Sequence, residues 1–148
     1  MGLDSYLSAK VYVNRLDATN IVTDAGLDRY IADPSVDIYG TTVSATCAYW
    51  RKANQIHNWF VNRVQRGNDD CGSYYVSRDK LQDLLKACKE VKEDNSKAEQ
   101  LLPTQSGFFY GGTQYDEWYF TDIDNTIKII EECLEDENAD EFEYSSSW

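Results

Sequence analysis

The chain has 148 residues, which is most simply one domain with a core large enough to fold without disulfides or a metal ion. It has no apolar run approaching the length of a membrane span and no signal-peptide pattern at its start, so we expect a cytoplasmic protein that contacts no membrane. Its formal net charge is −12, and residues 116–148 carry twelve acids against the single base Lys128. This balance argues against direct nucleic-acid binding and predicts that any charged partner is basic.

The first third of the chain predicts strands. Residues 3–16 alternate loosely between apolar and polar side chains, and the β-branched residues near Val11 favour a strand. Residues 17–34 are rich in turn formers, which predicts a long loop or a short helix around residues 27–31. Residues 36–49 favour a second extended segment, interrupted at Gly40 by a turn or bulge.

The clearest helix pattern covers residues 50–66 and ends at Gly67, which is typical of a C-terminal cap. Spacings of three and four define its predicted buried face: Ala53, Ile56, His57, Phe60, Val61 and Val64. The segment carries four Arg and Lys and no acid. We therefore expect it to form ion pairs with the acidic helix near the C-terminus, each worth about 0–1 kcal/mol.

Two more helices follow a short predicted strand at residues 74–76. Ser77 is expected to cap a helix over residues 78–93, and Thr121 is expected to cap a later one. A helical turn at residues 96–102 separates the two. Their predicted buried stripes are Leu81, Leu84, Leu85, Cys88 and Val91 in the first, and Ile123, Ile127, Ile130 and Leu134 in the second.

These elements predict an α+β fold, with three main helices packed on a small, largely antiparallel sheet that residues 108–110 could join. The strands cluster early and do not alternate regularly with helices, which argues against a doubly wound parallel sheet. We expect residues 1–136 to form a single globular domain. Residues 137–148 are acidic and lack periodicity, which predicts a frayed or disordered tail.

The most distinctive stretch is residues 102–120, because seven of the chain's 20 aromatic residues lie between positions 108 and 120. Glycines at 107, 111 and 112 interrupt the rings, so the stretch is either a core hairpin or a binding loop. Tyr and Trp are frequent anchors of protein interfaces, and acids favour a basic partner. The predicted partner-binding residues are Tyr115, Asp116, Glu117, Trp118, Tyr119, Glu131, Glu135 and Asp136.

A second group of residues is a candidate for ligand binding. His57 is the only histidine, and we interpret it as a core residue held by hydrogen bonds. As a general base it would need an acid such as Asp69, Asp70 or Asp116 within reach. The remaining candidates form one short loop, Thr104, Gln105, Ser106 and Gly107. This loop lacks the lysine and glycine spacing of a P-loop, so an ordinary turn is the simpler interpretation.

The four cysteines lack the close spacing of zinc or redox motifs, and we interpret them as reduced, mostly buried thiols. Cys71 follows two acids, which disfavour the thiolate form that a nucleophile needs. One histidine cannot build a multi-histidine metal site. We therefore expect neither a metal ion nor a cofactor, and we assign no catalytic residue.

Two separated motifs resemble a family of small uncharacterised proteins carried by phages and prophages. The first runs from residue 101 to 109 and continues at 115–119, and the second comprises residues 50–54 with Ile56 and His57. The similarity covers roughly residues 47–134, and the opening residues 1–4 also fit. The resemblance brings no activity, but it implies a phage-borne protein that binds and blocks a host machine.

Two functional hypotheses follow. The first is a phage accessory protein, not an enzyme, that inhibits a host nucleic-acid-handling or defence protein through an acidic and aromatic surface. The alternative is a small ligand-binding module or enzyme that uses His57 and the loop at residues 104–107. Convergence of the first helix and this loop in one pocket would favour the alternative. The sequence leaves the oligomeric state open.

Overall fold

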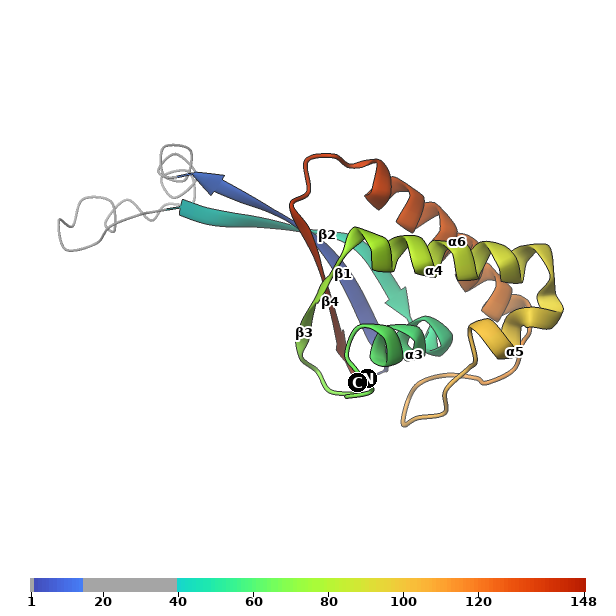
Figure 1. Ribbon diagram of the computed structural model, residues 1–148. Helices are drawn as coiled ribbons and strands as arrows, with labels where there is room; N and C mark the ends of the chain where they lie inside the picture. Colours follow the sequence, from blue (N-terminus) through green and yellow to red (C-terminus); the bar gives the residue numbers. More distant parts are fainter. Residues whose placement is uncertain (1, 15–39) are drawn as a thin grey trace.

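The computed structural model describes residues 2–14 and 40–148 (Figure 1). Within these ranges the strands are β1 (Asp4–Asn14), β2 (Gly40–Arg51), β3 (Ser73–Val76) and β4 (Glu141–Ser147). They form one antiparallel sheet in the order β2-β1-β4-β3. The predicted combination of helices with an antiparallel sheet is confirmed. The predicted loop at residues 17–34 and the strand residues 36–39 lie outside the described residues.

The two faces of the sheet differ in burial because side chains alternate along each strand. Leu7 in β1 pairs with Tyr144 in β4, and both are fully buried. The neighbouring Tyr6 points to the other face with Tyr49 of β2, where both rings are exposed. Beyond Lys10, β1 and β2 continue without β4 as a two-stranded ribbon (Figure 1).

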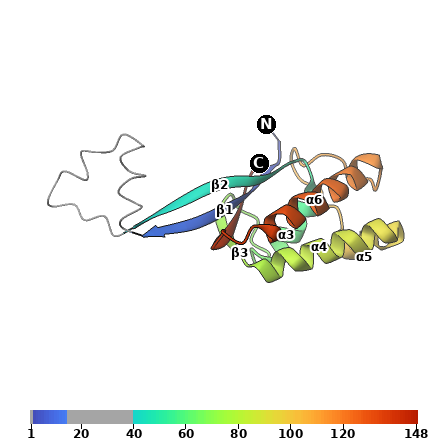
Figure 2. The same cartoon turned by 90° about the horizontal axis from the view of Figure 1, so that it is seen from above.

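Three helices of ten residues or more pack on the buried face. They are α3 (Asn54–Arg63), α4 (Arg78–Glu93) and α6 (Glu117–Glu135). A 3-10 turn, η1 (Asn95–Lys97), and the four-residue α5 (Ala98–Leu101) follow α4 and confirm the predicted helical turn. Figure 2 shows the helices gathered on one side of the sheet. Within the described residues, no helix is long and apolar enough to cross a membrane.

The predicted buried stripes are largely confirmed. Ile56 and Phe60 of α3 are fully buried, as are Leu81, Leu84, Cys88 and Val91 of α4 and Ile130 of α6. Three residues of the predicted stripes are only partly buried: Val64, Leu85 and Leu134.

The two predicted helix caps have different outcomes. Ser77 caps α4 as predicted, and its hydroxyl accepts the backbone N–H of Lys80 at 3.2 Å. The prediction that Thr121 caps the last helix is wrong, because Asp116 caps α6 by accepting the backbone N–H of Tyr119. The Thr121 hydroxyl instead donates to the carbonyl of Glu117 within the helix. A carboxylate five residues before Thr121 therefore sets the helix start.

The first helix begins later than predicted. Trp50 and Arg51 belong to β2, where they pair with β1. Lys52 then adopts a left-handed φ of 58°, which breaks the chain direction before α3 starts at Asn54. The helix also ends earlier than predicted, at Arg63 with Val64 as its C-cap, so the prediction that Gly67 caps it is wrong. Gly67, at a φ of 79°, lies in the turn beyond this cap.

The prediction of a frayed tail at residues 137–148 is wrong, since β4 lies between β1 and β3 in the centre of the sheet. Phe142, Tyr144 and Ser146 are buried, and Glu143 lies on the opposite face in an ion pair with Lys10 at 2.6 Å. Every second residue of this acidic segment is therefore buried, as expected for a strand with one face on the core. Conversely, residues 108–110 form a turn in a loop and join no strand.

The prediction that the acids of the last helix pair with the helix at residues 50–66 is wrong. Among the described residues, the ion pairs of α6 are formed with α4. Lys89 contacts Glu131 at 2.6 Å, and Lys92 contacts Asp124 at 2.7 Å. The helices α4 and α6 lie side by side, so the lysines of α4 are the cations nearest to these acids (Figure 2). About half of each of these side chains is exposed, so each pair contributes only about 0–1 kcal/mol.

Candidate functional site

The aromatic stretch forms a loop that Asn54 holds in place. The Asn54 amide donates to the carbonyls of Tyr110 and Gly112, at 3.1 and 2.8 Å. Its carbonyl oxygen accepts the backbone N–H of Gln105 at 3.0 Å. Asn54 itself is only 1% exposed, and the bond to Tyr110 is buried while the other two are partly buried. One side chain at the start of α3 therefore fixes both arms of the loop.

Further hydrogen bonds fasten the ends of this loop. Asn58 donates to the carbonyl of Pro103 at 3.0 Å, and Tyr119 donates to the carbonyl of Leu102 at 2.8 Å. Between them, the Thr104 hydroxyl bridges to the carbonyl of Thr113 at 3.0 Å. The stretch is thus an ordered loop that contains no strand, and it is not a core hairpin.

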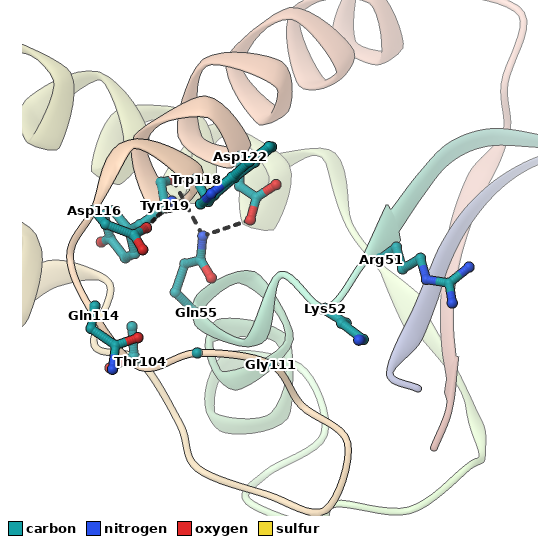
Figure 3. A pocket seen from close by; sticks show the side chains of 11 residues that line it. Arg51, Lys52, Gln55, Thr104, Gly111, Gln114, Asp116, Trp118, Tyr119 and Asp122 are labelled. Atoms are coloured by element: carbon teal, nitrogen blue, oxygen red, sulfur yellow. Dashed lines mark hydrogen bonds between the residues drawn. The ribbon is translucent and has the colours of Figure 1, made fainter. Parts of the chain in front are cut away.

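A pocket of about 290 Å³ opens where this loop meets α3 and α6 (Figure 3). The end of β2 and the start of α3 contribute Arg51, Lys52 and Gln55. The loop contributes Thr104, Gly111, Gly112 and Gln114. The cap and first turns of α6 contribute Asp116, Trp118, Tyr119 and Asp122. Segments far apart in the sequence therefore supply three walls.

The backbone beside this pocket is tightly constrained at Lys52. Its N–H donates to the carbonyl of Leu3 at 2.8 Å, which holds a non-glycine residue in the left-handed region. Gly111 faces it with a φ of 90°, and a Cβ atom there would lie 3.1 Å from the Lys52 Cβ. Glycine is needed at 111 for both its φ and this close approach. Such strain commonly marks a binding site.

The α6 wall of the pocket is acidic and aromatic. Asp122 accepts a hydrogen bond from Gln55 at 3.3 Å, and partial burial together with the nearby Asp116 charge raises the pKa of its carboxyl group. Trp118 is 79% exposed, so its indole is free to contact a bound group. A carboxylate pair beside an exposed indole suits a cation, through charge-assisted hydrogen bonds and a cation–π contact.

The wall formed by β2 and α3 carries the opposite charge. Arg51 and Lys52 are both exposed and lie on the far side of Gln55 from Asp116 (Figure 3). This wall can contact an anionic group, while the α6 wall favours a cationic one. The pocket is therefore dipolar, although the chain as a whole is strongly acidic.

His57 does not line this pocket, although the sequence grouped it with the loop at 104–107. It is fully buried on α3, and its Nδ1 lies 2.7 Å from the Tyr144 hydroxyl. Its Nε2 lies 3.0 Å from a carboxylate oxygen of Asp69, one of the acids named as its partner from sequence. Burial lowers the pKa of His57, and the Asp69 charge partly opposes this. The interpretation as a core histidine held by hydrogen bonds is confirmed.

Asp69 extends the contacts of the buried His57 into a network that reaches the surface. It accepts hydrogen bonds from the hydroxyl of Tyr110 at 2.8 Å and from the indole of Trp148 at 3.1 Å. The hydroxyl of Tyr144 also lies 3.0 Å from that of Ser5. The network thus joins strands β1 and β4, helix α3, the anchored loop and the C-terminal residue. Both ring nitrogens of His57 are occupied within it, which supports a structural role.

The predicted loop residues 104–107 differ in their roles. The backbone N–H of Gln105 is held by Asn54, and the ring of Tyr110 lies where a Cβ atom at Gly107 would be. Ser106 is exposed but does not line the pocket. Of this group, only Thr104 lines it.

The predicted partner-binding residues divide between two places. Asp116, Trp118 and Tyr119 line the pocket, whereas Tyr115 packs edge-on against Tyr119 with ring centroids 4.9 Å apart. The remaining four, Glu117, Glu131, Glu135 and Asp136, lie elsewhere on α6 or at its end. Because Glu131 is engaged by Lys89, the acidic stripe is partly neutralised within the chain.

Seven pocket residues were not predicted as site residues, namely Arg51, Lys52, Gln55, Gly111, Gly112, Gln114 and Asp122. Arg51 and Lys52 had been assigned to a helix, which hid the turn that brings them to the loop. The signal available in the sequence was this pair of adjacent cations, which ends two residues before Asn54. Gln55 and Asp122 fell within helix patterns, where polar residues usually face solvent.

The comparisons with known proteins add nothing to this geometry: no family model, curated protein or solved structure matches the chain. Across residues 2–14 and 40–148, no three His, Cys, Asp or Glu side chains gather closely enough to hold a metal ion.

Proposed function

We propose that this chain is a non-enzymatic binding protein, and that its pocket receives a cationic side chain from a partner with a basic surface. The observation that carries the proposal is the 79% exposed indole of Trp118, which lines the same pocket as Asp116 and Asp122. An exposed tryptophan lowers the solubility of a protein, so solubility does not explain its position beside the carboxylates. It does suit the anchor residue of an interface. The surrounding loop is already fixed by Asn54, so little conformational entropy is lost on binding.

The pocket has the chemistry to bind an arginine side chain. A guanidinium group can donate to a carboxylate while its plane lies on an aromatic ring. The cation–π contact is worth about 0.5–2 kcal/mol, and a hydrogen bond to a charged group about 1.5–3 kcal/mol. Together these terms are sufficient for one anchoring residue within a larger interface.

We further propose the biological setting implied by the resemblance to phage proteins. In that setting the chain acts in the host cytoplasm and inhibits a nucleic-acid-handling or defence protein. The net charge of −12 would steer it toward a basic surface that otherwise binds phosphate. A basic side chain held by Trp118 and Asp122 would then be withdrawn from nucleic acid.

The test is calorimetric titration of the protein with an arginine-rich peptide at low and raised salt. Wild-type protein should bind, and binding should weaken as salt screens the charges. Trp118→Ala and Asp122→Asn should each weaken binding by about tenfold, the equivalent of roughly 1.4 kcal/mol. The matched control is Tyr75→Ala, which removes a ring that is 64% exposed on the open face of the sheet, outside the pocket. Equal affinities for Trp118→Ala and Tyr75→Ala would refute the proposal.

A second candidate function rests on the opposite wall of the pocket. Because Arg51 and Lys52 line the same pocket as Asp116 and Asp122, a small dipolar ligand would contact groups of both charges at once. A thermal-shift comparison of free arginine with N-acetylargininamide separates the two functions, because the amide lacks the carboxylate. Stabilisation by free arginine alone would favour the small ligand, and equal stabilisation would favour the partner side chain.

A further inference from the structure

Two cysteines that are 86 residues apart lie with their sulfur atoms 3.4 Å from each other. Cys47 belongs to β2 and Cys133 to α6, so the pair spans the junction between the sheet and the helix layer. A disulfide bond is about 2.0 Å long, and side-chain adjustments of roughly 1.4 Å would therefore bring the sulfurs to bonding distance. We propose that this pair is an oxidation site, at which a hydroperoxide links β2 to α6 through a reversible disulfide.

A bulge in the sheet places Cys47 in this position. Leu7 pairs with Ala48 and Ser8 pairs with Thr46, so Cys47 is the extra residue without a partner in β1. Bulges redirect the side chain of the extra residue. The Cys47 side chain packs against the core, and its thiol donates to the carbonyl of Leu7 at 3.3 Å. The bulge thus aims a sulfur atom toward the helix layer.

The two thiols differ in access and in acidity. Cys133 is 5% exposed on the buried side of α6, whereas Cys47 is only partly buried and is open to a small oxidant. The Cys133 thiol donates to the Cys47 sulfur, which stabilises the Cys47 thiolate and lowers the pKa of Cys47. The same contact raises the pKa of Cys133, which keeps its proton. Cys47 is accordingly the attacking sulfur and Cys133 the resolving one.

The reaction balances with one hydroperoxide as the oxidant. The Cys47 thiolate attacks one peroxide oxygen, the O–O bond breaks, and the leaving hydroxide takes up a proton to give water. Cys47 is then a sulfenic acid. The Cys133 sulfur attacks the Cys47 sulfur, the S–O bond breaks, and the hydroxyl leaves as a second water with the Cys133 proton. Two thiols lose two electrons and two protons to one peroxide molecule, and a thiol reductant reverses the change.

The test uses the full chain, reduced and then exposed to increasing hydrogen peroxide before free thiols are blocked. Peptide mapping without reductant should show a linked pair of peptides carrying Cys47 and Cys133. The number of free thiols should fall from four to two, and dithiothreitol should restore all four. The oxidised protein should also melt at a higher temperature than the reduced protein, because the link restricts the unfolded chain.

Two variants identify the roles of the sulfurs. Cys133→Ser should leave Cys47 as a sulfenic acid that dimedone traps, because the resolving thiol is missing. The matched control is Cys71→Ser, which removes the exposed cysteine of the turn before β3 and should leave the linked pair unchanged.

Three outcomes would overturn the proposal. They are disulfides that join Cys71 in place of the pair, the same linkage pattern in urea-unfolded protein, and dimedone labelling of Cys133 in preference to Cys47. The mapping of wild-type protein decides the first two, so the test holds even if Cys133→Ser fails to fold.

Discussion

Replacing Asn54 with alanine should destabilise the protein and release the loop that bears the pocket. The substitution removes three hydrogen bonds that the loop backbone makes with the Asn54 side chain. A typical net contribution is about 0.5–1.5 kcal/mol per bond, and buried groups left without partners add to the cost. We therefore expect a loss of about 2–4 kcal/mol in the free energy of unfolding, which is large against a typical total of about 5–15 kcal/mol.

The assay is urea unfolding followed by circular dichroism, with hydrogen exchange of the loop amides measured alongside. The Asn54→Ala variant should unfold at lower urea with a similar slope, and the amide of Gln105 should exchange faster because its acceptor is gone. Asn62→Ala is the matched control, since its amide bonds only to Asn58 within the same helix and is exposed. That change should cost less than about 0.5 kcal/mol.

The reasoning fails if Asn54→Ala and Asn62→Ala are equally stable. It also fails if the loop amides keep their protection in Asn54→Ala, because the loop would then be held by other contacts.

Two further predictions concern pH and the last strand. Burial lowers the pKa of His57 below 6.5, so on acidification the unfolded chain takes up this proton before the folded protein does. The contribution of His57 to the free energy of unfolding should therefore be constant above about pH 6.5 and fall below it. The slope should be at most about 1.4 kcal/mol per pH unit. His57→Gln should flatten the slope between pH 7 and 5.5 in urea unfolding at each pH, and an unchanged slope would assign it to other groups. Phe142→Ala should cost about 3–5 kcal/mol in the same assay because the ring is 1% exposed, whereas a cost below 1 kcal/mol would indicate that β4 is not part of the core.

The helices were the most predictable part of the fold. The stripe in α4 and the cap at Ser77 follow from short-range spacing, which the sequence displays directly. The strand β4 was missed because local acidity outweighed an alternation of only three inward residues, Phe142, Tyr144 and Ser146. Its burial depends on β1, whose partner residues lie more than 130 positions earlier, and local patterns carry no such information.

The site was predicted in part for a related reason. Trp118 and Asp116 were chosen for their residue types, and both line the pocket. Lys52 was missed because its role follows from a backbone turn and from the close approach of Gly111, which only the assembled loop reveals. His57 was identified as a core residue, but the hydroxyl groups around it come from segments that sequence reasoning did not bring together.

The central position of β4 has a consequence for the order in which the sheet assembles. β1 can pair with β2 early in synthesis, but its other edge has no partner until residues 141–147 have left the ribosome. Until then β1 presents unpaired backbone groups, and β3 lacks the only strand with which it pairs among the described residues. Pairing across so long a separation is slow, and an open strand edge favours association between nascent chains. The half-made sheet is therefore the state of this protein that most needs protection from aggregation.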